Sequence, residues 1–494
     1  MVDININTNT NDKQDIEFYA ILKGFMSYDI DLDHIFKISE AYKLAKDAHQ
    51  SCFRKSGEPY ITHPLAVAKL AVEYKADYVT VCTSLLHDVV EDTSYSLEKI
   101  EEKFGKDIAI NVDGVTKITN MDYDLKKSEL NIKTICKLFK IMIYKDVRTV
   151  AVKLFDRLHN MRTMNFMSEE KRIAKSKETL KVYVPLAEAL GANQLKKELQ
   201  DLSFLYLERE KYDEISKQIA ETTKQHIDTI SDMKEDLHAK LEDEDIENDI
   251  KLRIKNIYNV YVSLSKGRDM DNIHDLFALQ IGLNRIPDCY LAFGVIHQNY
   301  PTYLQEKFKD YIFKCKTTGY RALHTTIVDK DQQMIQAQIR TKDMAWKNTR
   351  GIIGNLKDYN LTEFANIKKQ YPFFSICEEI DKVTNNNDFD FYDKLSYEIL
   401  GDKIYVTSEK SGKCIQLPFG ATVLDYAFDA CSNRAKRAVQ GVVNGKKVSL
   451  DYKLKNGDRV TFTSDEENTI DESWINECAT THGKRLIKEN LKRS

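Results

Sequence analysis

Four ionisable residues stand close together in the segment LLHDVVEDT, which follows the apolar or small residues of YVTVCTS without an intervening loop. They are His87, Asp88, Glu91 and Asp92. On a helix His87 would share a face with Glu91, and Asp88 with Asp92, because residues four positions apart are neighbours. Imidazole nitrogen and carboxylate oxygen together suit Mn²⁺, Fe²⁺ or Zn²⁺ better than Ca²⁺. The segment therefore indicates a metal site at the rim of an apolar core.

Two residues elsewhere in the chain could complete such a site. His63 stands in YITHP and Asp156 stands in KLFDRLHN. Each candidate also has an ordinary structural interpretation: a lone His-Asp pair is common on a surface, Asp156 can pair with Arg157, and His159 can be a structural hydrogen-bonding residue. The order His, His-Asp, Asp favours the metal site, and it is similar to the pattern of HD-type metal phosphohydrolases.

The elements that must position these residues are helices. The chain has 494 residues, of which 42% are hydrophobic and 30% charged, and its net charge is −4. This composition predicts several globular domains and gives no global reason to expect nucleic acid as a partner. Amphipathic patterns dominate up to about residue 248. VRTVAVKLFDRLHNMRT and TLKVYVPLAEALG predict two of these helices, the second of which ends at Gly191.

The pattern changes after that point. IHDLFALQIGL and HTTIVDKDQQMIQAQIRT predict strands, and CYLAFGVIHQNY between them predicts a helix, so an α/β domain is expected. From residue 401, short strand patterns surround the helical segment GATVLDYAFDAC. The dipeptides Asn444-Gly445 and Asn456-Gly457 predict tight turns between strands.

Cysteine usage and hydropathy indicate the compartment. Nine cysteines are scattered singly without a CxxC pair, which argues against a zinc ribbon and predicts reduced thiols in the cytoplasm. The polar N-terminal segment lacks a signal-peptide core, and no apolar run reaches the roughly 18 residues that a membrane helix needs. We therefore expect a cytoplasmic protein with no membrane partner.

Five blocks, in order, resemble the hydrolase domain of the RelA/SpoT family: FRKSGEPYITHP, LLHDVVEDT, VDGVTK, VKLFDRLHNMRT and VPLAEALG. Enzymes of this family make and destroy the alarmones ppGpp and pppGpp. The resemblance covers about residues 35 to 205. It implies an all-α HD-type domain that removes the 3′-diphosphate of ppGpp or pppGpp, giving GDP or GTP and pyrophosphate, and so lowers the alarmone in the stringent response.

The resemblance also implies a role for each matching position. Four residues would hold one Mn²⁺: His63, His87, Asp88 and Asp156. Two carboxylates would orient and activate the attacking water: Glu91 and Asp92. Four residues would contact the nucleotide and its phosphates: Arg54, Lys55, Asn160 and Thr163. The chemistry is consistent, because a divalent metal lowers the pKa of bound water and a nearby carboxylate can take its proton.

The α/β domain resembles the synthetase of the same family, a pyrophosphokinase that moves diphosphate from ATP to the 3′-oxygen of GDP or GTP. The matching segments are RIKNIYNVYVSL, IHDLFALQ, FKDYIFKCKTTGYRALHTT and QAQIRTKDMAW. The implied phosphate-facing bases are Arg253, Lys255, Lys309 and Lys316. Tyr320 would stack on guanine, His324 lies in the HTT motif, and Asp275 would bind Mg²⁺.

The second carboxylate of that Mg²⁺ site is missing, because QAQIRT has Gln336 where the family has glutamate. Mg²⁺ selects anionic oxygen, and an amide cannot take a proton from the attacking hydroxyl. Gln280, Lys307 and Cys315 also depart from the family pattern. We expect an inactive synthetase-like (pseudosynthetase) domain with a nucleotidyltransferase-like fold, which would use Mg²⁺ only if activity survived.

Three alternatives remain open at this stage. The chain could be a bifunctional synthetase/hydrolase that retains weak ATP:GTP 3′-pyrophosphokinase activity. It could instead be a non-catalytic sensor or regulator that binds guanine nucleotide through Tyr320 and the lysines. The hydrolase site could also accept adenosine alarmones.

Residues 401–465 resemble a TGS domain, a small β-grasp fold that contacts tRNA in ribosome-bound members of the family. Cys431 stands where a histidine is expected near the end of the helix of this module. We expect the module to serve as a regulatory or protein-contact domain more than as a tRNA or ribosome contact. The expected organisation is an N-terminal tail and first helix (1–34), the HD-type hydrolase domain (35–205), a helical connector (206–248), the synthetase-like domain (249–382), a linker (383–400), the TGS domain (401–465) and the start of a helical region (466–494).

Overall fold

The structure is a computed structural model of the chain. It describes residues 12–119, 127–270, 273–302, 308–313, 315–316, 318–330, 333–358, 368, 371–384, 387–401, 403–412 and 414–491. The chain divides into two compact units, each made of three segments. Unit 1 comprises Met1–Gln225, Asn256–Asp269 and Ala345–Ile367, and unit 2 comprises His226–Lys255, Met270–Met344 and Lys368–Ser494.

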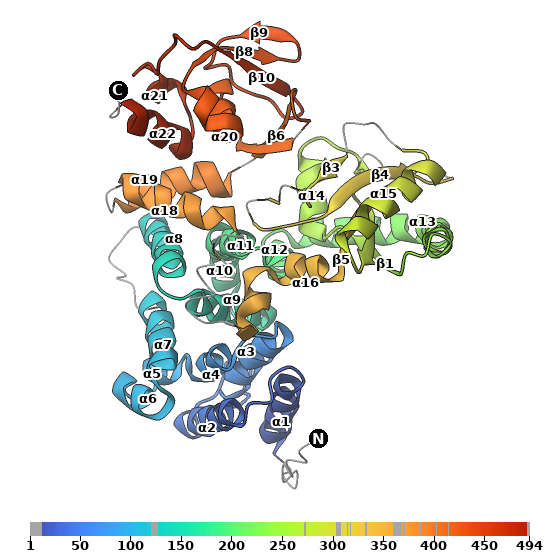
Figure 1. Cartoon of the computed structure of the whole chain (residues 1–494). Helices are drawn as coiled ribbons and strands as arrows, with labels where there is room; N and C mark the ends of the chain where they lie inside the picture. Colours follow the sequence, from blue (N-terminus) through green and yellow to red (C-terminus); the bar gives the residue numbers. More distant parts are fainter. Residues whose placement is uncertain are drawn as a thin grey trace. The chain divides into compact units, whose positions relative to one another are not determined.

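Unit 1 is helical (Figure 1). Its helices up to the connector are α1 (Lys13–Met26), α2 (Leu32–Ala48), α3 (Thr62–Glu73), α4 (Tyr78–Leu86), α5 (Val89–Asp92), α6 (Leu97–Phe104), α7 (Lys106–Thr119), α8 (Lys127–Tyr144), α9 (Val147–Arg162), α10 (Glu169–Glu178), α11 (Val184–Ala189) and α12 (Asn193–Leu207). The long α13 (Arg209–Glu242) follows in the region expected as a connector, and the division between the units falls within it, after Gln225. Helix α14 (Ile257–Ser265) belongs to unit 1.

Helices α3, α4 and α9 pack against one another and form the core beneath the candidate site. Helix α9 is buried on nearly all sides, so its apolar residues pack on several neighbours at once. Asp77 caps the amino end of α4, and Asp146 caps that of α9. Such caps satisfy amide groups that have no partner inside a helix, and they fix where each helix begins.

The segment LLHDVVEDT does not form one continuous helix. Helix α4 ends at Leu86 and α5 begins at Val89, so His87 and Asp88 lie in the turn between them. The Ser84 carbonyl, which would accept from the Asp88 amide in an unbroken helix, accepts a hydrogen bond from His87 Nδ1 at 2.8 Å. The backbone stays near helical values, and the Asp92 amide still donates to the Asp88 carbonyl at 2.8 Å. The pairing of His87 with Glu91, and of Asp88 with Asp92, on one helical face is therefore interrupted by the end of α4.

Unit 2 contains a five-stranded mixed sheet in the order β1-β2-β5-β4-β3. Its strands are β1 (Asn248–Ile254), β2 (Phe277–Leu283), β3 (Lys309–Asp310), β4 (Leu323–Val328) and β5 (Met334–Thr341). Strands β2 and β5 are parallel, and the other neighbours are antiparallel. Helix α15 (Ile286–Asn299) packs on β2 and β5, and α16 (Lys342–Arg350) follows β5.

A second five-stranded sheet of unit 2 has the order β7-β6-β10-β8-β9. Its strands are β6 (Lys403–Ser408), β7 (Cys414–Pro418), β8 (Ala438–Val443), β9 (Lys446–Val448) and β10 (Arg459–Ser464), with α20 (Val423–Ala435) packed on them. Asn444 and Gly445 join β8 to β9 with φ of 51° and 75°. The predicted tight turn is therefore confirmed, since a two-residue hairpin turn of this kind needs positive φ at both positions.

The segment 383–400, expected as a linker, is largely helical. Helix α18 (Pro372–Thr384) is followed by α19 (Asp388–Leu395) and a π-helical turn at Ser396–Leu400. Asn387 caps α19 by accepting from the amides of Phe389 and Asp390. Helices α21 (Trp474–Glu477) and α22 (Thr481–Leu491) lie in the C-terminal region, where helix was expected.

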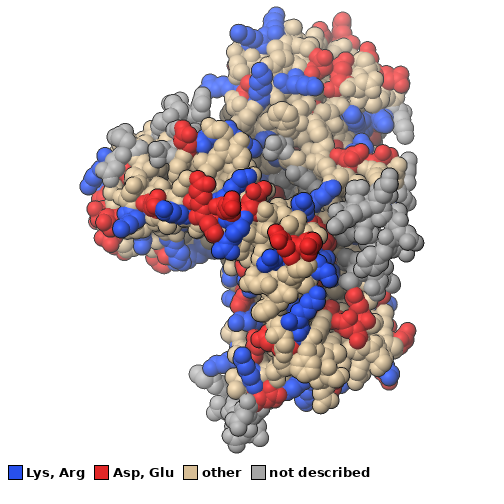
Figure 2. Space-filling view, turned by 180° about the vertical axis from the view of Figure 1, so that it is seen from behind, with Lys and Arg blue, Asp and Glu red and all other residues tan. Residues whose placement is uncertain are grey.

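On the face drawn in Figure 2, basic and acidic side chains are intermixed, in keeping with the net charge of −4. Within the described residues, no helix is both long enough and apolar enough to cross a bilayer.

Candidate active site

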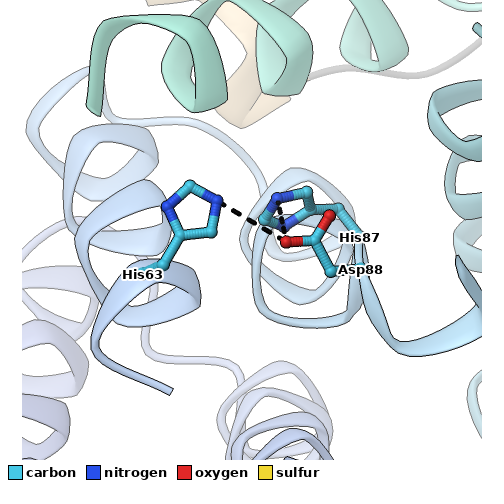
Figure 3. Close-up of side chains that lie close together, drawn as sticks. All are labelled: His63, His87 and Asp88. Carbon is cyan, nitrogen blue, oxygen red and sulfur yellow. Dashed lines mark ion pairs between the residues drawn. The ribbon is translucent and has the colours of Figure 1, made fainter. Parts of the chain in front are cut away.

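The structure brings the four predicted metal ligands together from three places in unit 1. His63 lies on α3, His87 and Asp88 lie in the α4–α5 turn, and Asp156 lies on α9. His63 Nε2 is 3.6 Å from Asp88 Oδ2 and 3.3 Å from Asp156 Oδ1, and His87 Nε2 is 3.2 Å from Asp88 Oδ2. Figure 3 shows both imidazole rings directed at the Asp88 carboxylate.

The donor set fits a divalent cation. Ligand atoms of His63, His87 and Asp88 all lie within 4.8 Å of one another. His87 is fully buried, and among the described residues its Nε2 makes no hydrogen bond of ordinary geometry, with the Asp88 carboxylate as its charged neighbour at 3.2 Å. A cation between these two groups would satisfy both of them. No second group of three such residues occurs in the described ranges.

Each candidate ligand is oriented by another group. The Tyr60 hydroxyl donates to Asp88 Oδ2 at 2.8 Å, and the Asn160 amide donates to Asp156 Oδ1 at 2.5 Å. Lys153, itself buried, places its Nζ 3.2 Å from Asp156 Oδ2. Outer hydrogen bonds of this kind fix ligand geometry and are a regular feature of metal sites.

Charge is concentrated at this cluster. Burial lowers the pKa of His87, but the Asp88 carboxylate outweighs burial and raises that pKa to about 9. Burial alone would raise the pKa of Asp156, but Lys153 and His63 hold it well below its ordinary value. Burial, together with His63 and Arg54, lowers the pKa of His159 to about 3. Ionised side chains that are buried in this way are tolerated only when they are paired with an opposite charge or bound to a metal.

The two predicted catalytic carboxylates lie on α5, one turn beyond the ligands. Glu91 is half-buried and Asp92 is exposed. Burial, and then the Asp88 and Asp92 carboxylates, raise the pKa of Tyr60, so Asp92 lies beside the same hydroxyl that contacts Asp88. Asp92, a predicted base, and Asp88, a predicted metal ligand, therefore both lie beside the Tyr60 hydroxyl.

A cavity of about 540 Å³ opens beside Asp156, and all four predicted nucleotide contacts line it: Arg54, Lys55, Asn160 and Thr163. Arg54 Nη2 donates to Asn160 Oδ1 at 3.2 Å and to Thr163 Oγ1 at 3.4 Å. Lys55 Nζ lies 3.6 Å from the sulfur of Met167. The predicted contacts thus gather on one wall.

Other basic residues of the cavity were missed by the sequence analysis. Lys153, Arg157 and Lys175 also line the cavity. Arg157 pairs with Glu178 at 2.9 Å and lies 4.0 Å over the Tyr183 ring. Glu178, and not the Asp156 considered from sequence, is therefore the ion-pair partner that the structure describes for Arg157. Positions 153 and 157 flank Asp156 on α9, so helical spacing around the candidate ligand was the signal that could have found them.

The synthetase-like residues lie on the first sheet of unit 2 and the loops beside it. Lys255 Nζ contacts Asp275 Oδ1 at 2.7 Å, and Arg253 Nη1 donates to the Asp275 carbonyl at 3.1 Å. The Tyr320 hydroxyl lies 2.8 Å from His324 Nε2. Lys309 pairs with His324 across β3 and β4, and Lys316 Nζ lies 5.1 Å from the centre of the Tyr320 ring.

An uncharged chain of amides occupies the centre of that sheet. Gln338 Nε2 donates to Gln336 Oε1 at 2.6 Å, and Gln280 Nε2 donates to Gln338 Oε1 at 3.1 Å. The two substituted positions, 280 and 336, are therefore linked through one side chain. Cys315 is among the described residues, whereas Lys307 lies outside them.

Three family models match successive parts of the chain. They are the HD domain at residues 41–193, the region found in RelA / SpoT proteins at 252–360, and the TGS domain at 404–464. With the two sheets and the helical unit described above, they confirm the predicted fold class: a helical HD domain, an α/β synthetase-like domain and a TGS domain.

Curated relatives match most of the chain. The GTP pyrophosphokinase of Myxococcus xanthus is 34% identical over 94% of this chain and 61% of its own length. The guanosine-3′,5′-bis(diphosphate) 3′-pyrophosphohydrolase of Haemophilus influenzae is 33% identical over 91% and 66%, and that of Aquifex aeolicus is 32% identical over 93% and 65%. The chain belongs to the RelA/SpoT family. It spans about three fifths to two thirds of the length of these relatives, whose names include both hydrolases and pyrophosphokinases.

Solved structures also match parts of the chain. A metazoan ortholog of SpoT that hydrolyses ppGpp is 26% identical over 35% of this chain and 92% of that chain, with a TM-score of 0.24.

Proposed function

We propose that this chain hydrolyses the 3′-diphosphate of ppGpp and pppGpp, giving GDP or GTP and pyrophosphate, with Mn²⁺ as the metal. It would thereby lower the alarmone pool in the stringent response. One observation carries the proposal: His63, His87, Asp88 and Asp156 converge beside a cavity with a basic wall. A mixed imidazole and carboxylate set suits Mn²⁺, Fe²⁺ or Zn²⁺, and the resemblance to the RelA/SpoT hydrolases favours Mn²⁺ among them.

The four ligands would hold the cation, which would lower the pKa of bound water and neutralise phosphate oxygens. The chain's own residues supply the remaining chemistry. Asp92, beside Tyr60, and Glu91 would orient the attacking water and accept its proton. Tyr60 and Asn160 hold the Asp88 and Asp156 carboxylates in place through their hydrogen bonds.

The cavity supports a nucleotide with several phosphates as the substrate. Its basic lining includes Arg54, Lys153 and Arg157, which can neutralise phosphate charge. Asn160 and Thr163 present an amide and a hydroxyl to the same space, and these groups can contact the nucleoside. The volume of about 540 Å³ lies in the usual range for a small-ligand site.

We further propose that the synthetase-like domain is inactive. Gln336 is neutral and is engaged with Gln338, and Lys255 already pairs with the remaining carboxylate, Asp275. The competing function is a bifunctional enzyme, which is favoured by relatives named as pyrophosphokinases. The TGS domain would contact a protein, or a tRNA on the ribosome, in the cytoplasm, and co-sedimentation with ribosomes tests the second contact.

The test is product identification with purified protein and labelled ppGpp. Wild type with Mn²⁺ should release GDP and pyrophosphate, and both EDTA and the Asp88→Ala substitution should abolish release. Asp213→Ala serves as the control, because Asp213 is an exposed aspartate on α13. Absence of both products from wild type, or release that is unaffected by EDTA, would overturn the proposal.

A further inference from the structure

His159 and His63 form a hydrogen-bonded pair of imidazoles. The two residues are 96 positions apart in the sequence, and their Nδ1 atoms lie 2.8 Å apart. The ring centres are 4.9 Å apart, and the planes are tilted by 39°. Helix α9 supplies both Asp156 and, one turn later, His159. The same helix therefore offers a carboxylate to His63 Nε2 and an imidazole to His63 Nδ1.

This contact relates the proton positions of the two rings. A hydrogen bond between two imidazole nitrogens needs one donor and one acceptor. His63 Nε2 faces the Asp88 and Asp156 carboxylates, and it would have to be free of its proton to bind a metal there. With a metal at that position, His63 Nδ1 would carry the proton and donate, and His159 Nδ1 would accept while its own proton lies on Nε2.

We propose that His159 is a positioning residue, which orients the metal ligand His63 and fixes its tautomer by accepting the His63 Nδ1–H hydrogen bond. The inference rests on the proposed metal site. A carboxylate, a backbone carbonyl or water usually takes this role toward a metal-bound histidine. The neighbouring His87 follows the usual arrangement, because its Nδ1 donates to the Ser84 carbonyl. At His63 a neutral imidazole replaces the carbonyl.

The geometry argues against His159 as a further metal ligand. Its Nδ1 is directed at His63 Nδ1, which lies on the side of the His63 ring opposite Nε2. His159 also lines the cavity.

Three substitutions in the full chain distinguish the loss of a hydrogen-bond acceptor from a change in packing. His159→Asn keeps an oxygen acceptor near the position of Nδ1, His159→Asp adds a charged acceptor there, and His159→Leu fills similar space without one. Mn²⁺ affinity of the metal-free protein is measured by calorimetric titration, and circular dichroism confirms folding. His159→Leu should bind Mn²⁺ about 10- to 100-fold more weakly than wild type, the usual loss for such an outer contact. His159→Asn should stay within about threefold of wild type, and His159→Asp should bind at least as tightly.

Kinetics and spectroscopy provide readouts that packing alone would not change. His159→Leu should recover most of its kcat at saturating Mn²⁺, with the KM for ppGpp little altered. In Zn²⁺-loaded wild type, ¹⁵N-histidine NMR should show His63 protonated at Nδ1 and His159 protonated at Nε2. The NMR measurement keeps the test decisive even where His159→Leu fails to fold.

The inference is overturned if His159→Leu binds Mn²⁺ as tightly as wild type, if His159→Asn and His159→Asp bind as weakly as His159→Leu, or if His159 carries its proton on Nδ1. These outcomes differ from failure of the proposed function. That failure would appear as wild-type protein that neither binds Mn²⁺ nor releases pyrophosphate from ppGpp.

Discussion

Arg148 Nη1 lies 2.8 Å from Asp77 Oδ2, and this buried ion pair joins the first turn of α9 to the first turn of α4. The same guanidinium also contacts Asp146, the cap of α9, at 2.7 Å. Helix α4 leads into His87 and Asp88, and α9 carries Asp156. One arginine therefore fixes the relative position of two helices that supply metal ligands from opposite sides.

Replacing Arg148 with methionine should destabilise unit 1 strongly. Asp77 and Asp146 would be left buried without their cation, and breaking a buried pair in this way costs about 3–5 kcal/mol. Urea denaturation followed by circular dichroism measures the change in the free energy of unfolding. Arg209→Met is the control, because its pair with Asp213 is more than half exposed and should contribute little to stability. Equal losses of unfolding free energy in Arg148→Met and Arg209→Met would contradict the proposed role of Arg148 in joining α4 to α9.

Arg54→Met should weaken substrate use more than folding. Arg54 joins Asn160 and Thr163 on the cavity wall, and a charged hydrogen bond contributes about 1.5–3 kcal/mol. Steady-state hydrolysis of ppGpp should therefore show kcat/KM reduced by about 10- to 100-fold, mainly through KM. Lys43→Met, an exposed lysine on α2, should change neither constant. A fall in kcat with an unchanged KM would place Arg54 in the chemical step instead.

Restoring the acidic residue should restore some synthesis. In an Asp88→Ala background, which prevents product hydrolysis, the chain with Gln336 should form no ppGpp from ATP, GDP and Mg²⁺. Gln336→Glu regains an anionic Mg²⁺ ligand and keeps the acceptor for Gln338, so product should appear, and adding Gln280→Arg should increase it. Gln333→Glu, outside the amide chain, is the matched control. Synthesis by the Gln336 protein at the rate of Gln336→Glu would instead identify a bifunctional enzyme.

The stability of the C-terminal helix should depend on pH through His482 and Glu379. The hydrogen bond with Glu379 raises the pKa of His482, with Arg485 opposing and Asp429 adding to the effect. A histidine whose pKa is raised in the folded protein contributes its full stabilisation at pH values below its unfolded pKa of about 6.5. That contribution disappears as the pH rises through the folded pKa. His482→Gln should lower the free energy of unfolding by less than about 1 kcal/mol at pH 5.5, because the pair is partly exposed.

At pH 9 the same substitution should have no measurable effect. The control is the double variant: in a Glu379→Gln background, His482→Gln should change nothing at either pH. A loss that persists at pH 9, or that survives removal of Glu379, would contradict the assigned pair.

The convergence of His63, His87, Asp88 and Asp156 could be predicted from sequence because their residue types and order are unusual together. The break between Leu86 and Val89 could not, since it depends on the His87 ring reaching the Ser84 carbonyl while the backbone stays nearly helical. The His159 contact with His63 is equally invisible in a chain where the two residues are 96 positions apart. Long-range packing, not local pattern, determines both features.

Two features of the domain organisation also depend on long-range packing and could not be predicted from sequence patterns. Residues 256–269 and 345–367 belong to unit 1, although they fall within the expected synthetase-like domain. At Gly351, φ is +62° and an added Cβ would lie 1.9 Å from the Leu190 carbonyl oxygen, a backbone contact that no composition pattern reveals. By contrast, the helix α19 was predictable: Asn387 followed by two acidic residues in the first turn is a recognisable helix start.

The most direct test is a crystal of the full chain grown with Mn²⁺ and measured at the manganese absorption edge. The account predicts one anomalous peak enclosed by His63 Nε2, His87 Nε2 and the carboxylates of Asp88 and Asp156, and loss of that peak in Asp156→Asn. A wild-type crystal with no peak at that position, at a Mn²⁺ concentration that supports full hydrolysis, would contradict it.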